Sequence, residues 1–203
     1  MIYDIGLLFA ILGSYALLDG TIASILAFCI APIYLIATKR TRLLKYFVIS
    51  IIITSIYLLI AHEYYNYGTN ALMPFGLPML PFFAWSIGLF AVRIIVEQIH
   101  AKPWKQFIII TALYWIVLLS METIAYHLIG IRNIATAAYP GLPICDCIHA
   151  PQWMQVSYLL IGPGYLIICA VYDKIHNKII GKIKIVRKNK LNKSQTKKIS
   201  KTK

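Results

Sequence analysis

Glu122 is the residue of this chain with the clearest potential for acid–base chemistry. It lies in a long apolar segment, residues 106–128, about two helical turns before the segment ends. An apolar environment disfavours a charged carboxylate, so this side chain is expected to be protonated or paired. A carboxylic acid that stays neutral can donate a proton to a bound substrate. Glu122 is therefore the predicted catalytic acid, and the alternative is a hydrogen-bonded clasp between helices.

Two further residues are predicted to assist Glu122. His127 lies in the same segment, and Asp146 follows in a loop rich in proline. Five residues separate Glu122 from His127, which on a helix turns their side chains about 140° apart. The two therefore need not form one dyad, and each is a separate catalytic candidate.

The sequence Cys145-Asp146-Cys147-Ile148-His149 has the residue types of a metal site. Alternate residues of an extended strand point to the same side, so both thiols and the imidazole would face one ion. Thiolate and imidazole ligands favour Zn or Cu(I). The usual zinc pattern includes a second ligand pair, and none is obvious here. A disulfide and an ordered loop without a metal are therefore the alternatives.

Two positions predict where a substrate pocket would lie. Gly162-Pro163-Gly164 interrupts an apolar segment, and proline leaves a backbone carbonyl without its helical partner, so a kink beside a cavity is expected. His62-Glu63 ends another apolar segment on the same predicted side of the membrane. Adjacent residues diverge on a helix, so at most one of these two would face the pocket. A solvated pair at the membrane boundary is the alternative.

The composition indicates which elements must position these residues. Of 203 residues, 60% are hydrophobic and 13% are charged, and the mean hydropathy is +0.72. Soluble domains contain about 25% charged residues, and a soluble fold of this size cannot bury so much apolar surface. The chain is therefore predicted to be an integral membrane protein.

Six segments have the roughly 17–25 mostly apolar residues that a membrane-spanning helix needs. The first carries an acidic residue and no positive start, so it is interpreted as a retained helix and not as a signal peptide. Together they predict an all-α bundle and one transmembrane domain over residues 1–173. The six segments are residues 2–18, 21–38, 45–63, 80–99, 106–128 and 153–173.

The distribution of basic residues predicts how these helices are oriented. Clusters at 39–45 and 102–105 lie between predicted helices, and twelve of the twenty Lys and Arg lie in 174–203. Basic residues favour the cytoplasmic side of a membrane. With both termini in the cytoplasm, all three groups lie inside and the outer loops hold a single basic residue, Arg132. The chain is thus predicted to be a multi-pass protein of the cell membrane.

The basic tail, residues 174–203, is predicted to have two parts. Apolar residues recur at helical spacing among lysines up to about residue 188, as in an amphipathic helix that binds the anionic lipids of the inner leaflet. The remainder is polar and is predicted to be disordered. Nucleic acid is a less favoured partner for this tail.

Part of the chain shows the pattern of an internal repeat. His62 precedes Gly76-Leu77-Pro78 by 14 residues, and His127 precedes Gly141-Leu142-Pro143 by the same distance. An offset of 65 residues therefore superposes the third and fourth predicted helices on the fifth and sixth. Parallel repeats occur in membrane proteins, and a chance match is the alternative.

Both Gly-Leu-Pro sequences resemble helix entries of membrane-embedded carotenoid biosynthesis proteins of the hydratase type. In those proteins a Gly-hydrophobic-Pro entry is followed by tryptophan, as the first entry here is followed by Trp85 and the second by Trp153. The resemblance covers only these two entries. Residues 145–149 replace the Asn-Phe stretch of that family, so the chain is not identified as a member.

Three classes of function fit these observations. The favoured one is an intramembrane enzyme that modifies a lipid or an isoprenoid, with Glu122 as the acid. The second is a small transporter or channel in which Glu122 binds a proton or a cation beside the interrupted helix. The third is a non-catalytic subunit or scaffold of a membrane complex. The partners considered besides the bilayer are a second copy of the chain and a membrane partner subunit.

Overall fold

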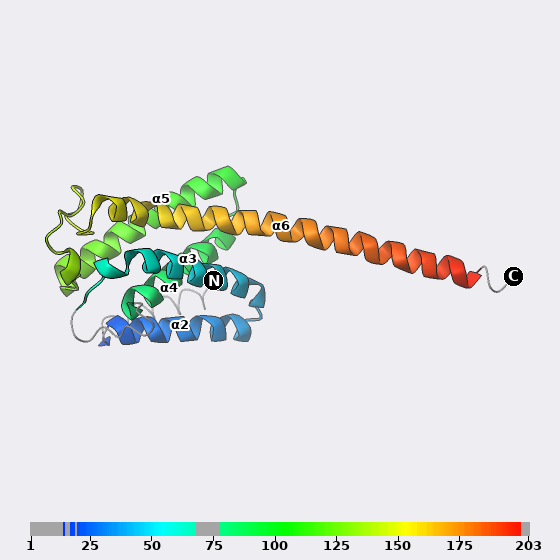
Figure 1. Ribbon diagram of the computed structural model, residues 1–203, viewed down its shortest axis with the longest axis horizontal. Helices are drawn as coiled ribbons and strands as arrows, with labels where there is room; N and C mark the ends of the chain where they lie inside the picture. Colours follow the sequence, from blue (N-terminus) through cyan, green and yellow to red (C-terminus); the bar gives the residue numbers. More distant parts are fainter. Residues whose placement is uncertain (1–13, 15–16, 19, 68–77, 200–203) are drawn as a thin grey trace. The chain divides into compact units, whose positions relative to one another are not determined.

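The computed structural model of this chain describes residues 14, 17–18, 20–67 and 78–199, with side chains up to residue 178 (Figure 1). Within these ranges the chain is helical and forms no β-strand. An isolated bridge pairs Leu142 with Cys147. The predicted all-α class is therefore confirmed.

The described residues contain five helices that are long and apolar enough to cross a membrane. Each begins within a few residues of a predicted span, and the first four also end close to the predicted ends. Short helical turns lie between them: η1 (Thr41–Leu43), η2 (His62–Tyr64), the π-helical η4 (Ile124–Ile129) and η5 (Ile134–Thr136). The five long helices are α2 (Gly20–Ala37), α3 (Leu44–Ala61), α4 (Met79–Gln98), α5 (Pro103–Thr123) and α6 (Gln152–Ile199).

Some features predicted from the sequence lie outside the described residues. Nearly all of the predicted first span, residues 2–18, lies outside the described residues, and so does Asp19. The Gly76-Leu77 half of the predicted repeat is also outside the described ranges. The count of six spans, their orientation and the repeat therefore stay predictions.

Small residues allow α2 and α3 to pack closely against α4. Ala23, Ala27 and Ala31 recur every four residues on α2 and are buried, as are Ser50 and Thr54 on α3. Residues four apart share one face of a helix. Small side chains on such a face let membrane helices approach each other, so this sequence pattern positions the three helices.

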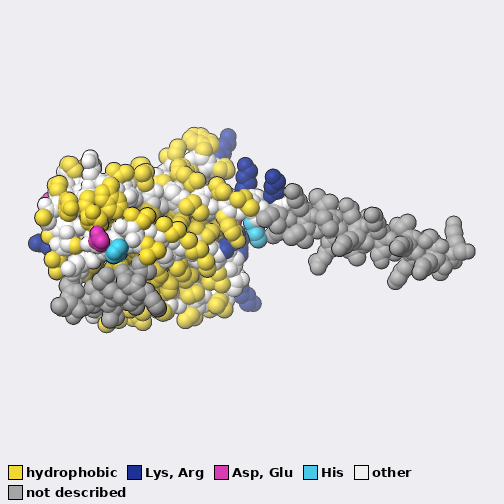
Figure 2. Space-filling view, in the orientation of Figure 1, with side chains coloured by type: hydrophobic (Ala, Val, Ile, Leu, Met, Phe, Trp, Pro, Cys, Tyr) yellow, Lys and Arg dark blue, Asp and Glu magenta, His cyan; other side chains and the backbone are white. Residues whose placement is uncertain are grey.

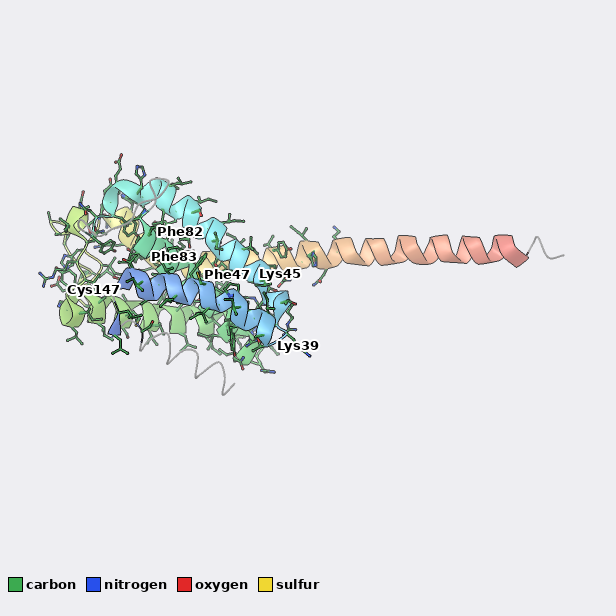
Figure 3. All side chains as sticks on the ribbon, turned by 90° about the horizontal axis from the view of Figure 1, so that it is seen from below. Lys39, Lys45, Phe47, Phe82, Phe83 and Cys147 are labelled. Atoms are coloured by element: carbon green, nitrogen blue, oxygen red, sulfur yellow. A yellow bond between two sulfur atoms is a disulfide. The ribbon has the colours of Figure 1, made fainter. Side chains whose placement is uncertain are left out.

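Phenylalanine rings fill the space between these three helices (Figure 3). The ring of Phe28 on α2 lies 5.0 Å from that of Phe47 on α3 and 4.8 Å from that of Phe83 on α4, between ring centroids. Tilted and edge-on ring pairs of this kind stabilise a core beyond the burial of their area. The rings therefore hold α2, α3 and α4 together as one body.

The outward faces of the helices are apolar, and Figure 2 shows hydrophobic side chains over most of the helical body. Ile33, Ile52 and Ile116, on three different helices, are 64%, 52% and 61% exposed. Contiguous apolar surface on this scale is unfavourable in water and marks contact with a membrane or a partner. These faces are those expected of a membrane helical bundle.

The links between α2 and α3 and between α4 and α5 meet at one end of the bundle. Arg42 of the first link donates a hydrogen bond to Glu97 of α4 at 3.2 Å. Gln106 of α5 donates to the backbone carbonyls of Val96 (2.6 Å) and Ile99 (2.8 Å), which end α4. Carbonyls at the end of a helix lack their usual i+4 partners, and the Val96 carbonyl also accepts from the Ile99 N–H at 3.3 Å. Gln106 thus fastens the end of α4 to α5. We call this the basic end, after Lys39, Arg40, Arg42, Lys45, Lys102 and Lys105.

The chain divides into two compact units, Met1–Leu166 and Ile167–Lys203. In the second unit α6 continues to Ile199, beyond residue 188, where the sequence predicts that the helical part of the tail ends. Residues 189–199 contain neither glycine nor proline, so nothing in them interrupts a helix. The domain boundary at residue 173 stays a prediction.

Candidate functional site

Glu122 lies on a face of α5 that points into the bundle. Tyr114 precedes it by eight residues, and on an α-helix residues four and eight apart lie on one face. Tyr114 is buried, so this face is turned inward, and Glu122 is half-buried on it.

α5 leads into the loop that contains Cys147, and Figure 3 shows this loop at the opposite end of the bundle from Lys39 and Lys45. We call this the loop end, after residues 62–67 and 124–151.

Four tyrosines lie near enough to Glu122 for its charge to act on them. They come from α3, α5, α6 and the segment after η2. With Tyr65 they form what we call the tyrosine cluster. The four tyrosines on which the charge of Glu122 acts directly are Tyr57, Tyr67, Tyr114 and Tyr158.

The hydroxyl groups of the tyrosine cluster are connected by hydrogen bonds. Those of Tyr65 and Tyr158 lie 2.9 Å apart, and the Tyr65 hydroxyl is 3.5 Å from that of Tyr57. The Tyr114 hydroxyl donates to the backbone carbonyl of Tyr158. Trp85 of α4 packs edge-on against Tyr158, with 4.7 Å between ring centroids. The cluster thus joins α3, α4, α5 and α6 around polar groups.

Two members of the tyrosine cluster lie outside the membrane-spanning helices. Burial raises the pKa of both Tyr65 and Tyr67, and the nearby Glu122 carboxylate raises that of Tyr67 further. Burial does so because it disfavours the charged phenolate. Both hydroxyl groups therefore stay protonated near neutral pH and can donate hydrogen bonds.

α5 ends at Thr123, and the rest of the predicted segment, up to residue 128, lies in the π-helical turn η4. π-helical turns are rare and occur frequently at functional sites. His127 lies in this turn and is exposed. Its Nε2 atom is 3.2 Å from the carbonyl oxygen of Cys145 and 3.1 Å from that of Asp146. The structure thus brings His127 to Asp146, through the backbone of Asp146.

The Asp146 carboxyl group belongs to a second polar group at the loop end. Its Oδ1 atom lies 3.5 Å from Nε2 of His149. The other ring nitrogen of His149 is 2.8 Å from the carbonyl oxygen of Tyr139, and its ring stacks on Tyr126 at 4.4 Å between centroids. None of the contacts in the described ranges joins this group to Glu122. The three predicted catalytic residues are therefore divided between two places.

Cys145 and Cys147 form a disulfide, one of the alternatives to a metal site. A disulfide lacks the thiolate groups that Zn or Cu(I) would bind, so in this structure the predicted ligands Cys145, Cys147 and His149 offer no thiolate to a metal ion. Among the described residues, no three His, Cys, Asp or Glu side chains are arranged to hold a metal ion. The assumed extended strand is also absent here, because Asp146 and Ile148 have φ angles of 45° and 54°.

Gly162-Pro163-Gly164 is a place of close helix packing. The ring of Tyr114 lies against Gly162 and occupies the space where a side chain would be. Pro163 leaves the carbonyl of Leu159 without its helical donor, and the indole nitrogen of Trp115 on α5 donates to that oxygen at 2.8 Å. The freed carbonyl therefore faces a neighbouring helix, as expected, but Gly162 adjoins a ring and not an open pocket.

His62 and Glu63 lie in η2, next to each other and on the surface. Their side chains are 49% and 79% exposed, with 4.0 Å between Nε2 and Oε1. His62 also makes a local hydrogen bond to the carbonyl of Leu59 at 3.0 Å. This is the geometry of a solvated boundary pair, and the predicted pocket role of both residues has no support from these contacts.

Asn133 is a connecting residue that the sequence analysis did not single out. Its amide nitrogen donates to the carbonyl of Tyr64 at 2.6 Å, and its amide oxygen accepts from the backbone of Asn66 at 2.9 Å. The same oxygen accepts from Ala135 and caps η5. Asparagine is a favoured cap, which is the signal that the sequence offers. This side chain ties the α5–α6 loop to the segment after α3.

We expect Asn133→Ala to lower the stability of the loop end by about 1–3 kcal/mol, because it removes the hydrogen bonds of this side chain to backbone groups of Tyr64 and Asn66. The measurement is the thermal midpoint together with hydrogen exchange at the Asn66 amide. Asn133→Asp keeps the acceptor and loses the donor, so an intermediate loss is expected. Equal exchange at Asn66 in the wild type and the alanine variant would refute this account.

Comparison with known proteins identifies no relative on which this site could be mapped. No protein-family model, no curated protein and no solved structure matches the chain.

Proposed function

We propose that this protein is an intramembrane enzyme that modifies a lipid or an isoprenoid, with Glu122 as its proton donor. The observation that carries the proposal is a half-buried carboxyl group on an apolar helix, near a cluster of tyrosines whose hydroxyl groups are linked by hydrogen bonds. Apolar and aromatic surroundings favour the neutral carboxylic acid, which proton donation at neutral pH requires. Glu122 is half-buried, so an apolar chain in the surrounding lipid has access to it.

The reaction best suited to this site is protonation of a carbon–carbon double bond. The proton of Glu122 passes to one alkene carbon, whose π electrons form the new C–H bond, and the other carbon becomes a cation. The faces of aromatic rings attract cations, and Tyr57 and Tyr158, with Trp85 packed against both, supply such rings. The Glu122 carboxylate then takes a proton from an adjacent carbon, which gives an isomer, or from an added water, which gives an alcohol.

The proposed arrangement in the membrane has six spans, both termini in the cytoplasm of the cell, and the loop end outside. The basic end supports it, because basic residues favour the cytoplasmic side. Trp104, which is 61% exposed next to Lys105, fits the membrane boundary, where tryptophan is enriched. The Glu122 site then lies in the outer half of the bilayer.

Glu122→Gln is expected to reduce product formation by about 10²–10⁴-fold, the usual contribution of a general acid. Glutamine keeps the size of the side chain but has no transferable carboxylic proton. The measurement is the lipid and isoprenoid profile of cells that express each variant. Glu63→Gln is the matched control, because it removes an exposed carboxyl group at the same end and should leave the profile unchanged. An unchanged profile with folded Glu122→Gln protein would refute the enzyme proposal.

A small transporter or channel is the second candidate, because a carboxyl group among aromatic rings is also suited to a cation. In this case Glu122 exchanges a proton or binds a cation during transport. Proton or organic-cation flux into proteoliposomes that depends on Glu122, without any change in the lipid profile, would favour this candidate over the enzyme.

A further inference from the structure

A shallow cavity of about 290 Å³ lies at the basic end, where α4 ends and α5 begins. Gln106 is part of its lining and is held in place by two hydrogen bonds, to the carbonyls of Val96 and Ile99 at the end of α4. Neither the tyrosine cluster nor the α5–α6 loop contributes to it. Its lining residues are Arg93, Val96, Glu97, Ile99, His100, Ala101 and Gln106.

The charges around this cavity favour an anion. Glu97 is the acidic residue in the lining, and its carboxylate lies 3.2 Å from Arg42 and 3.9 Å from Arg40. Arg93 adds a third guanidinium, which lies 4.1 Å above the ring of Tyr46. Arg93 is the arginine in the lining, whereas Arg40 and Arg42 lie outside it and offset the charge of Glu97. The surroundings therefore carry an excess of positive charge, and guanidinium groups match the geometry of phosphate oxygens.

His100 adds a group that can respond to a bound phosphate. Its Nδ1 atom lies 3.2 Å from the carbonyl oxygen of Gln98, so this nitrogen carries the proton that the carbonyl accepts. Nε2 is then the nitrogen available to a ligand. The lining of the cavity thus includes one guanidinium, of Arg93, and one imidazole, of His100.

We propose that this cavity binds the phosphate headgroup of an anionic membrane lipid. Exposed Trp104 lies in the first turn of α5, and tryptophan at such a position marks the depth of lipid headgroups. Basic pockets between membrane helices bind headgroups of this type. The ligand chemistry is a phosphate ester, and a lipid is its source in the proposed membrane arrangement, in which the basic end lies at the inner surface of the bilayer. The proposal is independent of the Glu122 chemistry.

Purified full-length protein in phosphatidylcholine nanodiscs, with and without phosphatidylglycerol, tests the site. Phosphatidylglycerol is expected to raise the thermal midpoint of the wild type. Arg93→Gln and His100→Ala are each expected to weaken this lipid's binding, measured by native mass spectrometry, by about fivefold. Inorganic phosphate at the same concentration should have no effect; an equal effect of phosphate would overturn the lipid source.

Arg132→Gln is the matched control, because Arg132 also lies above a tyrosine ring, at 4.9 Å from Tyr126, but at the loop end. It should bind the lipid as the wild type does. Equal loss in Arg132→Gln, or wild-type binding in both cavity variants, would overturn the proposal. If Arg93→Gln does not fold, the lipid binding of His100→Ala decides the test, because His100 is exposed and its substitution should not affect folding. Glu122→Gln leaves the cavity intact and should bind the lipid as the wild type does. A negative result for the lipid site therefore does not refute the proposed reaction, and the reverse also holds.

Discussion

Gly162→Ala is expected to lower the free energy of unfolding by about 1–3 kcal/mol, the usual cost of overpacking a filled interface. A Cβ atom on Gly162 would lie 2.6 Å from Cζ of Tyr114 and 2.7 Å from two other atoms of its ring. The ring cannot move aside easily, because the Tyr114 hydroxyl donates to the Tyr158 carbonyl. Trp115 holds the next carbonyl, that of Leu159. The added methyl group must therefore push α5 and α6 apart.

Gly164→Ala, two residues further along the same helix, is the matched control. No atom lies within 4 Å of a Cβ at this position, and alanine is favoured over glycine in a helix by up to about 1 kcal/mol. Thermal midpoints of both variants in one detergent decide the prediction. If both substitutions lower the midpoint equally, the effect belongs to the Gly-Pro-Gly backbone and not to the Tyr114 contact.

The membrane-spanning helices could be predicted from the sequence because each depends on a long apolar run and not on tertiary contacts. The bounds of α2, for example, differ by one residue at each end from the predicted segment 21–38. The candidate span that contains α5 ends at Ile129, one residue beyond the predicted end, but its π-helical last turn was not predicted. Apolar residues continue to Ile129, and composition does not distinguish the π-helical turn η4 from an α-helix.

The surroundings of Glu122 could be predicted only in part. The sequence indicates a carboxyl group deep in an apolar segment, and it places Tyr114 on the same helix face. It does not show that this face points inward, or that Tyr57 and Tyr158 approach from other helices. Such contacts depend on how the helices are packed. The hydrogen bond between Tyr65 and Tyr158, which lie 93 residues apart, is one such contact.

The cysteine loop shows why residue types alone did not determine a site. Two cysteines and a histidine at alternate positions face one ion only if the backbone is extended. The backbone here turns at Asp146 and Ile148, and positive φ angles are rare for residues other than glycine, especially β-branched ones. Aspartate tolerates such an angle better than most residues, but isoleucine does not predict one. Glu122 stays a predicted proton donor, and in this structure the two cysteines form a disulfide instead of a pair of thiolate ligands.

Gly141→Ala is expected to open the loop between α5 and α6, at a cost of about 1–3 kcal/mol for the clash. The added Cβ would lie 2.8 Å from the backbone carbonyl carbon of Asp146. This backbone cannot retreat, because the disulfide encloses it and its N–H donates to the Leu142 carbonyl at 2.8 Å. An open loop exposes Cys147, which is fully buried. The measurement is the rate at which a small reducing agent cleaves the disulfide of the folded protein, and faster cleavage is expected.

Two further variants separate the backbone clash from other causes. Gly88→Ala adds the same methyl group to α4, where no atom lies within 4 Å, and it should leave the cleavage rate unchanged. The Asp146 side chain is also close to the added Cβ, with Oδ1 at 2.8 Å, but it is 74% exposed and can swing into solvent. Asp146→Ala should therefore fail to rescue Gly141→Ala, because the backbone obstacle persists. Full rescue would show that the side chain was the obstacle and would contradict a rigid loop backbone.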